Sequence, residues 1–149
     1  MLETLLTPET VQVRQAGNLD WEEAIRQAAT PLLTAGKVEQ KYVDAMIAVV
    51  KKNGPFINIG PHIALAHARP EDGVNHMGMA LMKVNPAINL VSAEHPITLF
   101  FVLAASDNTT HLQALQELAT KLQNSESLNK IEQATTVEEL VTEFKGVEE

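Results

Sequence analysis

The sequence predicts a single α/β (α+β) domain, over residues 1–149, in which helices pack on a small β-sheet. Three observations favour this fold. Apolar residues recur at helical spacing near the start and the end of the chain. Between them lie short apolar or β-branched segments bounded by Gly and Pro, as strands are. No linker divides the chain, and 149 residues are enough to bury one hydrophobic core.

Two helices are expected before the strands. The first begins at Trp21, after Asp20 as its cap, and Pro31 within it is expected to kink or interrupt it. The second runs from Glu39 or Gln40 to Lys52 and ends at an Asn-Gly-Pro breaker. Both helices place apolar residues on one face, so each is expected to cover the sheet.

The expected strands fill the middle of the chain. They cover residues 56–60, 63–67, 76–84, 88–91 and 97–105. Asn85-Pro86 is expected to turn the chain after the third of them. The last segment, ITLFFVLAA, is a continuous apolar run, which is typical of a strand covered on both faces.

Three helical segments are expected after the last strand. They are SDNTTHLQALQELATKL (106–122), SLNKIEQA (127–134) and TVEELVTEF (136–144). Asp107, Asn108 or Thr109 can cap the first of these helices. Acidic residues begin the third, where the helix dipole favours negative charge.

The composition excludes several classes of function. The formal net charge of −8 and the scattered Lys and Arg residues disfavour a nucleic-acid partner and a basic membrane-binding face. The absence of cysteine removes disulfides, thiolate nucleophiles and Cys-based zinc sites, and it fits the reducing cytoplasm. The N-terminus has no secretory signal pattern, and the longest apolar run falls far short of the ~20 residues that span a bilayer. We therefore expect a soluble, cytoplasmic protein.

Two histidines are candidates for one site. His67 ends a predicted strand, and His111 lies in the first turn of the helix that follows the strongest strand. Ligand and catalytic groups of open sheets gather at the carboxyl ends of strands. If these two strands are parallel and adjacent, both imidazoles face one crevice; if they are antiparallel, the rings lie at opposite ends.

Phosphate chemistry fits the residues around these histidines. The first turn of the helix, with Asn108 and Thr109, offers N–H groups and a dipole that bind anions. Arg69 offers a planar fork suited to phosphate oxygens. Phosphoryl transfer depends on positioning and charge stabilisation, so a histidine nucleophile with these groups suits that reaction.

Other interpretations of the histidines remain open at this point. A single histidine is more often a solvated surface residue than a catalyst. A zinc site is conceivable at His62, His67 and His76, although their spacing matches no compact ligand set. The chain has no HExxH, no GxSxG and no P-loop sequence, so neither a metalloprotease, a serine hydrolase nor direct nucleotide binding is indicated.

The string HARPEDGV (67–74), with YVDAMI, NGPFINIGP and SDNTTHLQAL, closely resembles the enzyme IIA component of the bacterial phosphoenolpyruvate-dependent sugar phosphotransferase system. The likeness is strongest to the ascorbate type within the mannitol-fructose superfamily, and it covers nearly the whole chain. It implies a small mixed β-sheet flanked by helices on both faces. Relatives typically carry Pro at the position of Ala66 and often Gly at that of His62.

The resemblance also implies a role for each site residue. His67 would accept a phosphoryl group from the carrier HPr and pass it to a IIB domain, whose IIC partner carries the sugar, here L-ascorbate, across the membrane. His111 would position or neutralise the phosphoryl group, and His62 would lie near the site. No metal or other cofactor is implied. A regulatory module of the same fold, whose phosphorylation state another protein reads, is the alternative.

Overall fold

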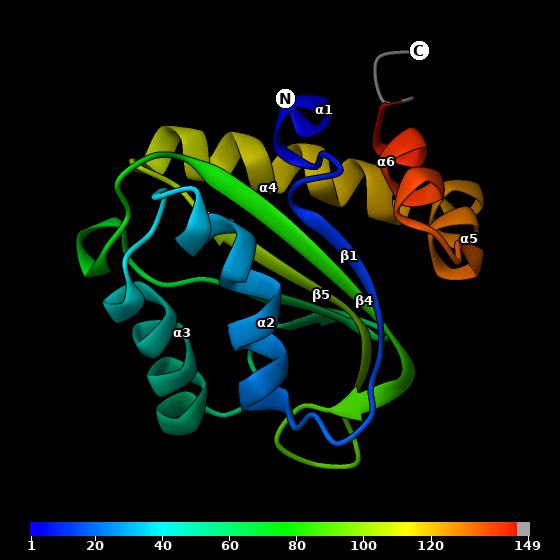
Figure 1. The fold of residues 1–149 in the computed structure, drawn as a ribbon, viewed down its shortest axis with the longest axis horizontal. Coiled ribbons are helices and arrows are strands. Elements are labelled where there is room, and N and C mark those ends of the chain that lie inside the picture. Colours follow the sequence, from blue (N-terminus) through cyan, green and yellow to red (C-terminus); the bar gives the residue numbers. More distant parts are fainter. Residues whose placement is uncertain (146–149) are drawn as a thin grey trace.

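The computed structural model describes residues 1–145 (Figure 1), and it confirms a single-domain α/β fold with a mixed sheet. The helices of this part are α1 (Leu2–Leu5), α2 (Trp21–Thr34), α3 (Gln40–Asn53), α4 (Asn108–Gln123), α5 (Ser125–Gln133) and α6 (Val137–Lys145), with a short 3₁₀ helix η1 (Pro70–Asp72). The strands are β1 (Val11–Gln15), β2 (Asn58–Gly60), β3 (Ile63–Ala66), β4 (Gly78–Asn89) and β5 (Pro96–Ala104).

The order of strands across the sheet is β1-β4-β5-β3-β2. β3 is parallel to β5 and β1 is parallel to β4, whereas the central pair β4–β5 and the edge pair β2–β3 are antiparallel. The carboxyl ends of β3 and β5 therefore meet at one end of the sheet. The carboxyl ends of β1 and β4 lie at the other end.

Helices cover both faces of the sheet, with α2 and α3 on one side and α1, α4, α5 and α6 on the other (Figure 1). The central strand β5 supplies both cores because side chains alternate along a strand. Phe100 and Val102 belong to the core under α2 and α3. Leu99, Phe101 and Leu103 belong to the core under α4 to α6. This confirms the prediction that 97–105 is a strand covered on both faces.

Helix α2 begins where the sequence predicted, and the Asp20 carboxylate accepts a hydrogen bond from the N–H of Glu23 at 2.9 Å. The helix is not interrupted at Pro31. Proline has no N–H, so the carbonyl of Gln27 loses its partner within the helix. The side-chain amide of Gln12, on β1, donates to that carbonyl at 2.8 Å. A neighbouring strand thus satisfies the group that the proline leaves free.

Two further expectations about the sheet were wrong or incomplete. The chain does not turn at Asn85-Pro86, because β4 is one strand of 12 residues that runs through it, with an irregular register between Lys83 and Ile88. Proline is accommodated at such irregular positions because no regular ladder hydrogen bond is required there. Of the predicted strand at 88–91, only residues 88–89 are strand, as the end of β4, and residues 90–91 lie beyond it. Strand β1 and helix α1 were missed altogether.

Candidate functional site

His67 and His111 lie side by side at the end of the sheet where β3 and β5 finish. Their ring centroids are 5.7 Å apart, and the two ring planes are inclined at 59°. His67 directly follows β3, and His111 lies in the first turn of α4, which follows β5. Because β3 and β5 are parallel neighbours, the condition under which the two rings would face one crevice is met.

A hydrogen bond fixes the tautomer of His67. Its Nδ1 lies 3.0 Å from the carbonyl oxygen of Leu65. A carbonyl oxygen only accepts, so a neutral His67 ring carries its proton on Nδ1 and leaves the lone pair of Nε2 free. The ring is half-buried and continues the face of β3 that carries Leu65, which is the face covered by α4. Nε2 is therefore the ring nitrogen that is free to act as a nucleophile.

Phe56 forms another wall of the site. Its ring packs edge-on against His67, with centroids 5.9 Å apart and planes at 75°, and 46% of the residue stays exposed. Edge-to-face packing of this kind is a favourable arrangement of two aromatic rings. Phe56 was assigned only to a strand in the sequence, since no local signal distinguishes an aromatic wall from a core residue.

The pKa of His111 is lowered, first because the ring is partly buried and second because His67 lies beside it. Partial burial and the neighbouring ring thus both favour the neutral form of His111. A neutral imidazole at this place can donate one N–H to an oxygen of a bound anion.

An NMR titration should therefore give His111 a midpoint below its ordinary value of 6.5. His67→Ala should raise that midpoint, because it removes the neighbouring charge and part of the burial. Since the pKa is lower in the folded state, this histidine's contribution to stability is present above pH 6.5 and is lost as the pH falls through the lowered pKa. A midpoint at or above 6.5, or no change in His67→Ala, would contradict the coupling of the two rings.

The amino end of α4 is capped by its own chain. The Asp107 carboxylate accepts hydrogen bonds from the N–H of Thr110 at 2.8 Å and from its hydroxyl at 3.0 Å. Asn108 and Thr109 are exposed in the first turn, beside this carboxylate. Their predicted contact with phosphate stays a prediction.

The guanidinium of Arg69 is engaged by acids of its own loop. It donates from Nη2 to Asp72 Oδ1 at 3.3 Å and from Nε to Asp72 Oδ2 at 3.3 Å, and it lies 3.8 Å from Glu71. This pairing, chiefly the hydrogen bonds, lowers the pKa of Asp72. The guanidinium of Arg69, which was predicted to bind phosphate, thus stabilises the loop around η1. Its contact with phosphate stays a prediction.

His62 does not lie beside His67. It precedes β3, whereas His67 follows that strand, so the two residues are at opposite ends of it. His62 has a φ of 68°, in the left-handed region that glycine adopts most easily. A Gly at this position would adopt the same conformation without strain. Within residues 1–145, no group of three or more His, Cys, Asp or Glu residues is arranged to hold a metal ion.

A family comparison agrees with this geometry. The family described as "Phosphoenolpyruvate-dependent sugar phosphotransferase system, EIIA 2" matches residues 4–146. The chain belongs to this EIIA family. It is 31% identical over 121 residues to the mannitol-specific cryptic phosphotransferase enzyme IIA component of Escherichia coli K12, covering 81% of this chain and 82% of that relative. It is 26% identical over 129 residues to the ascorbate-specific EIIA component of the same strain, covering 85% and 84%.

Solved EIIA structures share the fold. The solution structure of the mannitol-specific cryptic enzyme IIA from Escherichia coli superposes with a TM-score of 0.86 at 27% identity, covering 97% of this chain and 98% of the other. Enzyme IIA for mannitol, in a complex with phosphorylated enzyme IIB from Escherichia coli, superposes with a TM-score of 0.80 at 28% identity, covering 95% and 97%. EIIA components are phosphotransferases, so this EIIA chain is a phosphocarrier of the sugar phosphotransferase system. None of the helices within residues 1–145 is long and apolar enough to cross a membrane.

Proposed function

We propose that this EIIA component accepts a phosphoryl group from phospho-HPr on Nε2 of His67 and passes it to a cognate IIB domain, in the cytoplasm, during uptake of L-ascorbate through the IIC partner of that IIB. The observation that supports this most strongly is the histidine pair. A nucleophilic nitrogen with a fixed tautomer lies next to a second, neutral imidazole at one end of the sheet.

The transfer is a displacement at phosphorus. The Nε2 lone pair of His67 forms a new P–N bond while the P–N bond to the donor histidine breaks, and the electron pair of that bond returns to the donor ring. The His67 ring becomes more positive as the bond forms, and the Leu65 carbonyl on Nδ1–H stabilises this change. His111 donates an N–H to a phosphoryl oxygen, and it acts without needing a metal. On discharge, a nucleophile of IIB forms a new bond to phosphorus while the P–N bond to His67 breaks, and the electron pair of that bond returns to the His67 ring.

Exposed apolar side chains next to the site support transient docking of partner proteins. Phe56 packs against His67, and Leu112 follows His111 on α4 and is 56% exposed. Small transient interfaces place apolar groups at the centre and charges at the rim. The net charge of −8 favours partners with basic rims.

Leu112→Ser should raise the KM for phospho-HPr several-fold and leave kcat nearly unchanged, because the side chain contributes to docking and not to chemistry. Steady-state transfer at varied HPr concentration measures both constants. Val91→Ser is the matched control, since Val91 is 49% exposed but lies next to the far end of β4. Equal effects of the two substitutions would argue against a docking surface at the site.

The function is tested by intact mass after incubation with enzyme I, HPr and phosphoenolpyruvate. We expect one acid-labile phosphoryl group, and no gain would refute the phosphocarrier role. The phosphorylated chain is then offered to IIB domains of ascorbate and mannitol systems side by side, since relatives of both names match it. Discharge to the ascorbate IIB alone supports the proposed substrate, whereas phosphorylation without discharge to any IIB would favour the regulatory module.

A further inference from the structure

The hydroxyl of Tyr42, on the first turn of α3, lies between the two chain segments that carry the histidines. It accepts a hydrogen bond from the N–H of Ala68 at 3.0 Å and donates to the carbonyl of Leu103 at 2.7 Å. Ala68 directly follows His67, and Leu103 lies near the end of β5, which leads into α4 and His111. Tyr42 is the only tyrosine in the chain, and it is fully buried.

The register of the sheet shows what this hydroxyl replaces. Leu99 N–H donates to the His62 carbonyl, and the pairing of β3 with β5 runs on to Ala66 opposite Val102. Each further hydrogen bond of a parallel ladder advances by two residues along a strand. If this ladder continued past Ala66 and Val102, one of its hydrogen bonds would join Ala68 N–H directly to the Leu103 carbonyl. In the structure, the Tyr42 oxygen stands between these two groups and separates the ends of the strands.

The same turn of α3 also contacts the far end of the loop that runs from His67 to Gly73. The N–H of Glu39 donates to the Gly73 carbonyl at 2.9 Å. Gly73 has a φ of 134°, and a Cβ there would lie 3.1 Å from both the backbone nitrogen and the Cβ of Tyr42. The loop from His67 to Gly73 is thus fixed at both ends by one helical turn.

We propose that Tyr42 is a positioning residue, whose hydroxyl wedges apart the carboxyl ends of β3 and β5 and so sets the place of His67 relative to His111. Packing alone does not require the hydroxyl, because Phe has nearly the same shape. A buried hydroxyl is unfavourable unless it is hydrogen-bonded, and here both bonds are made to the backbone next to the site. The inference rests on the proposed function for its effect on transfer, but the geometry it concerns is independent of that function.

The hydroxyl keeps this role over the whole physiological range of pH. Burial raises the pKa of Tyr42 to about 12. The group therefore remains protonated and can donate to Leu103 while it accepts from Ala68. The Tyr42 hydroxyl is therefore not expected to lose its proton at any pH at which His67 and His111 change their charge.

Tyr42→Phe is the test. Without the hydroxyl, Ala68 N–H loses its acceptor and the Leu103 carbonyl loses its donor. The two strand ends are then expected to close on each other through a direct hydrogen bond, which shifts His67. Transfer from phospho-HPr to the variant should slow roughly tenfold or more, because small misplacements of reacting groups are costly. The ¹⁵N signals of the His67 ring should also move from separate Nδ1–H and Nε2 values toward averaged ones, because the bond to Leu65 is loosened. Thermal unfolding records the stability of each variant.

Val43→Ala is the control, since Val43 is the next residue on α3, is fully buried, and loses only apolar volume. Wild-type transfer in Tyr42→Phe, or equal slowing in both variants, would overturn the inference while leaving a phosphorylated wild type and the proposed function intact. If the wild type were not phosphorylated, the proposed function would fail. The ¹⁵N signals of His67 would still test whether Tyr42 positions that ring. His67 signals unchanged by Tyr42→Phe would then overturn the wedge.

Discussion

His67→Ala should abolish acid-labile phosphorylation of the chain. The variant loses Nε2, the nitrogen that the hydrogen bond from Nδ1 to Leu65 leaves unprotonated, and no other side chain at the site replaces it. His111 is the neighbouring imidazole, but its assigned part is to donate an N–H, so it does not substitute as acceptor. Intact mass after incubation with enzyme I, HPr and phosphoenolpyruvate should show no gain, against one phosphoryl group on the wild type.

Two companion variants make this result specific. His111→Ala should still take up one phosphoryl group, but about 10- to 100-fold more slowly, because one charge-stabilising donor is lost. His95→Ala should behave as the wild type. His95 lies just before β5, at the opposite end of that strand from the histidine pair, and its ring is hydrogen-bonded to the side chain of Asn58 on β2. Phosphorylation that survives in His67→Ala and disappears in His111→Ala would instead identify His111 as the acceptor.

The sequence predicted most of the scaffold that brings these histidines together. Strong apolar periodicity placed α2, α3 and α4, and the run around Phe100 identified the central strand. The candidate site was located by the rule that functional groups gather at the carboxyl ends of strands, and its function stays a prediction. The direction of β3 relative to β5 was beyond the sequence, because strand pairing depends on contacts between residues far apart in the chain.

The missed elements have weak local signals. β1 is an edge strand of five residues with one buried residue, Val11, and three of its five positions are polar. In β4, Asn85 and Pro86 are typical turn residues, yet pairing with β1 on one side and β5 on the other carries the strand through them. Tertiary pairing here overrides local preference.

The partners of polar side chains were the least predictable feature. The guanidinium fork of Arg69 suits a phosphate and a carboxylate equally well. The carboxylate of Asp72 is only three residues away in the same loop, and it forms the ion pair in the structure. The hydroxyl of Tyr42 meets Ala68 and Leu103, which lie 26 and 61 residues away in sequence. Sequence shows which groups can bond, whereas the fold decides which of them meet.

Lys83→Met should destabilise the chain by about 2–4 kcal/mol, because a buried cation that serves several backbone acceptors is lost. Lys83 is 8% exposed, and its ammonium donates to the carbonyl of Ile131 at 3.0 Å, to that of Ala134 at 2.6 Å and to that of Glu132. These carbonyls end α5, where the helix dipole favours a cation. Burial lowers the pKa of Lys83, and these acceptors compensate the ammonium for its lost hydration.

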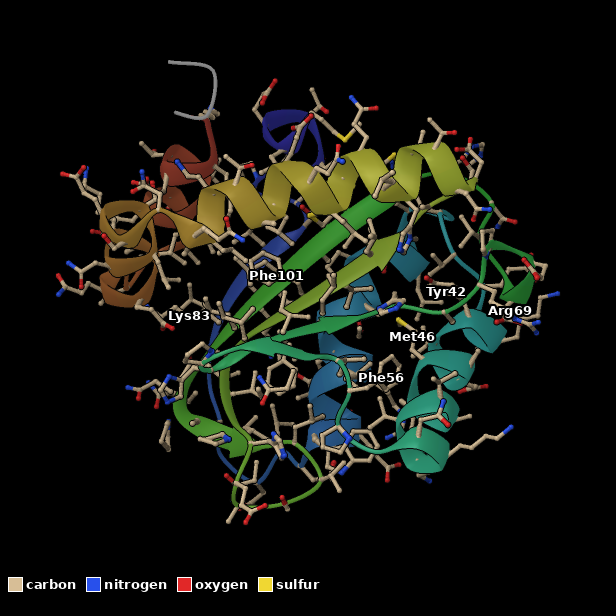
Figure 2. The ribbon with its side chains drawn as sticks, turned by 180° about the vertical axis from the view of Figure 1, so that it is seen from behind. Tyr42, Met46, Phe56, Arg69, Lys83 and Phe101 are labelled. Carbon is tan, nitrogen blue, oxygen red and sulfur yellow. The ribbon has the colours of Figure 1, made fainter. Side chains whose placement is uncertain are left out.

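Urea unfolding measures the loss, and hydrogen exchange of the α5 amides shows where it acts. Lys130→Met is the matched control, since it removes the same charge from an exposed position on α5. A difference of less than about 0.5 kcal/mol between the two variants would show that Lys83 does not hold the helix. Figure 2 shows Lys83 at the opposite end of the sheet from Tyr42 and Arg69. The folded fraction of Lys83→Met should therefore accept a phosphoryl group at the wild-type rate. The hydrogen bonds of Lys83 to the end of α5 lie far from the histidine pair.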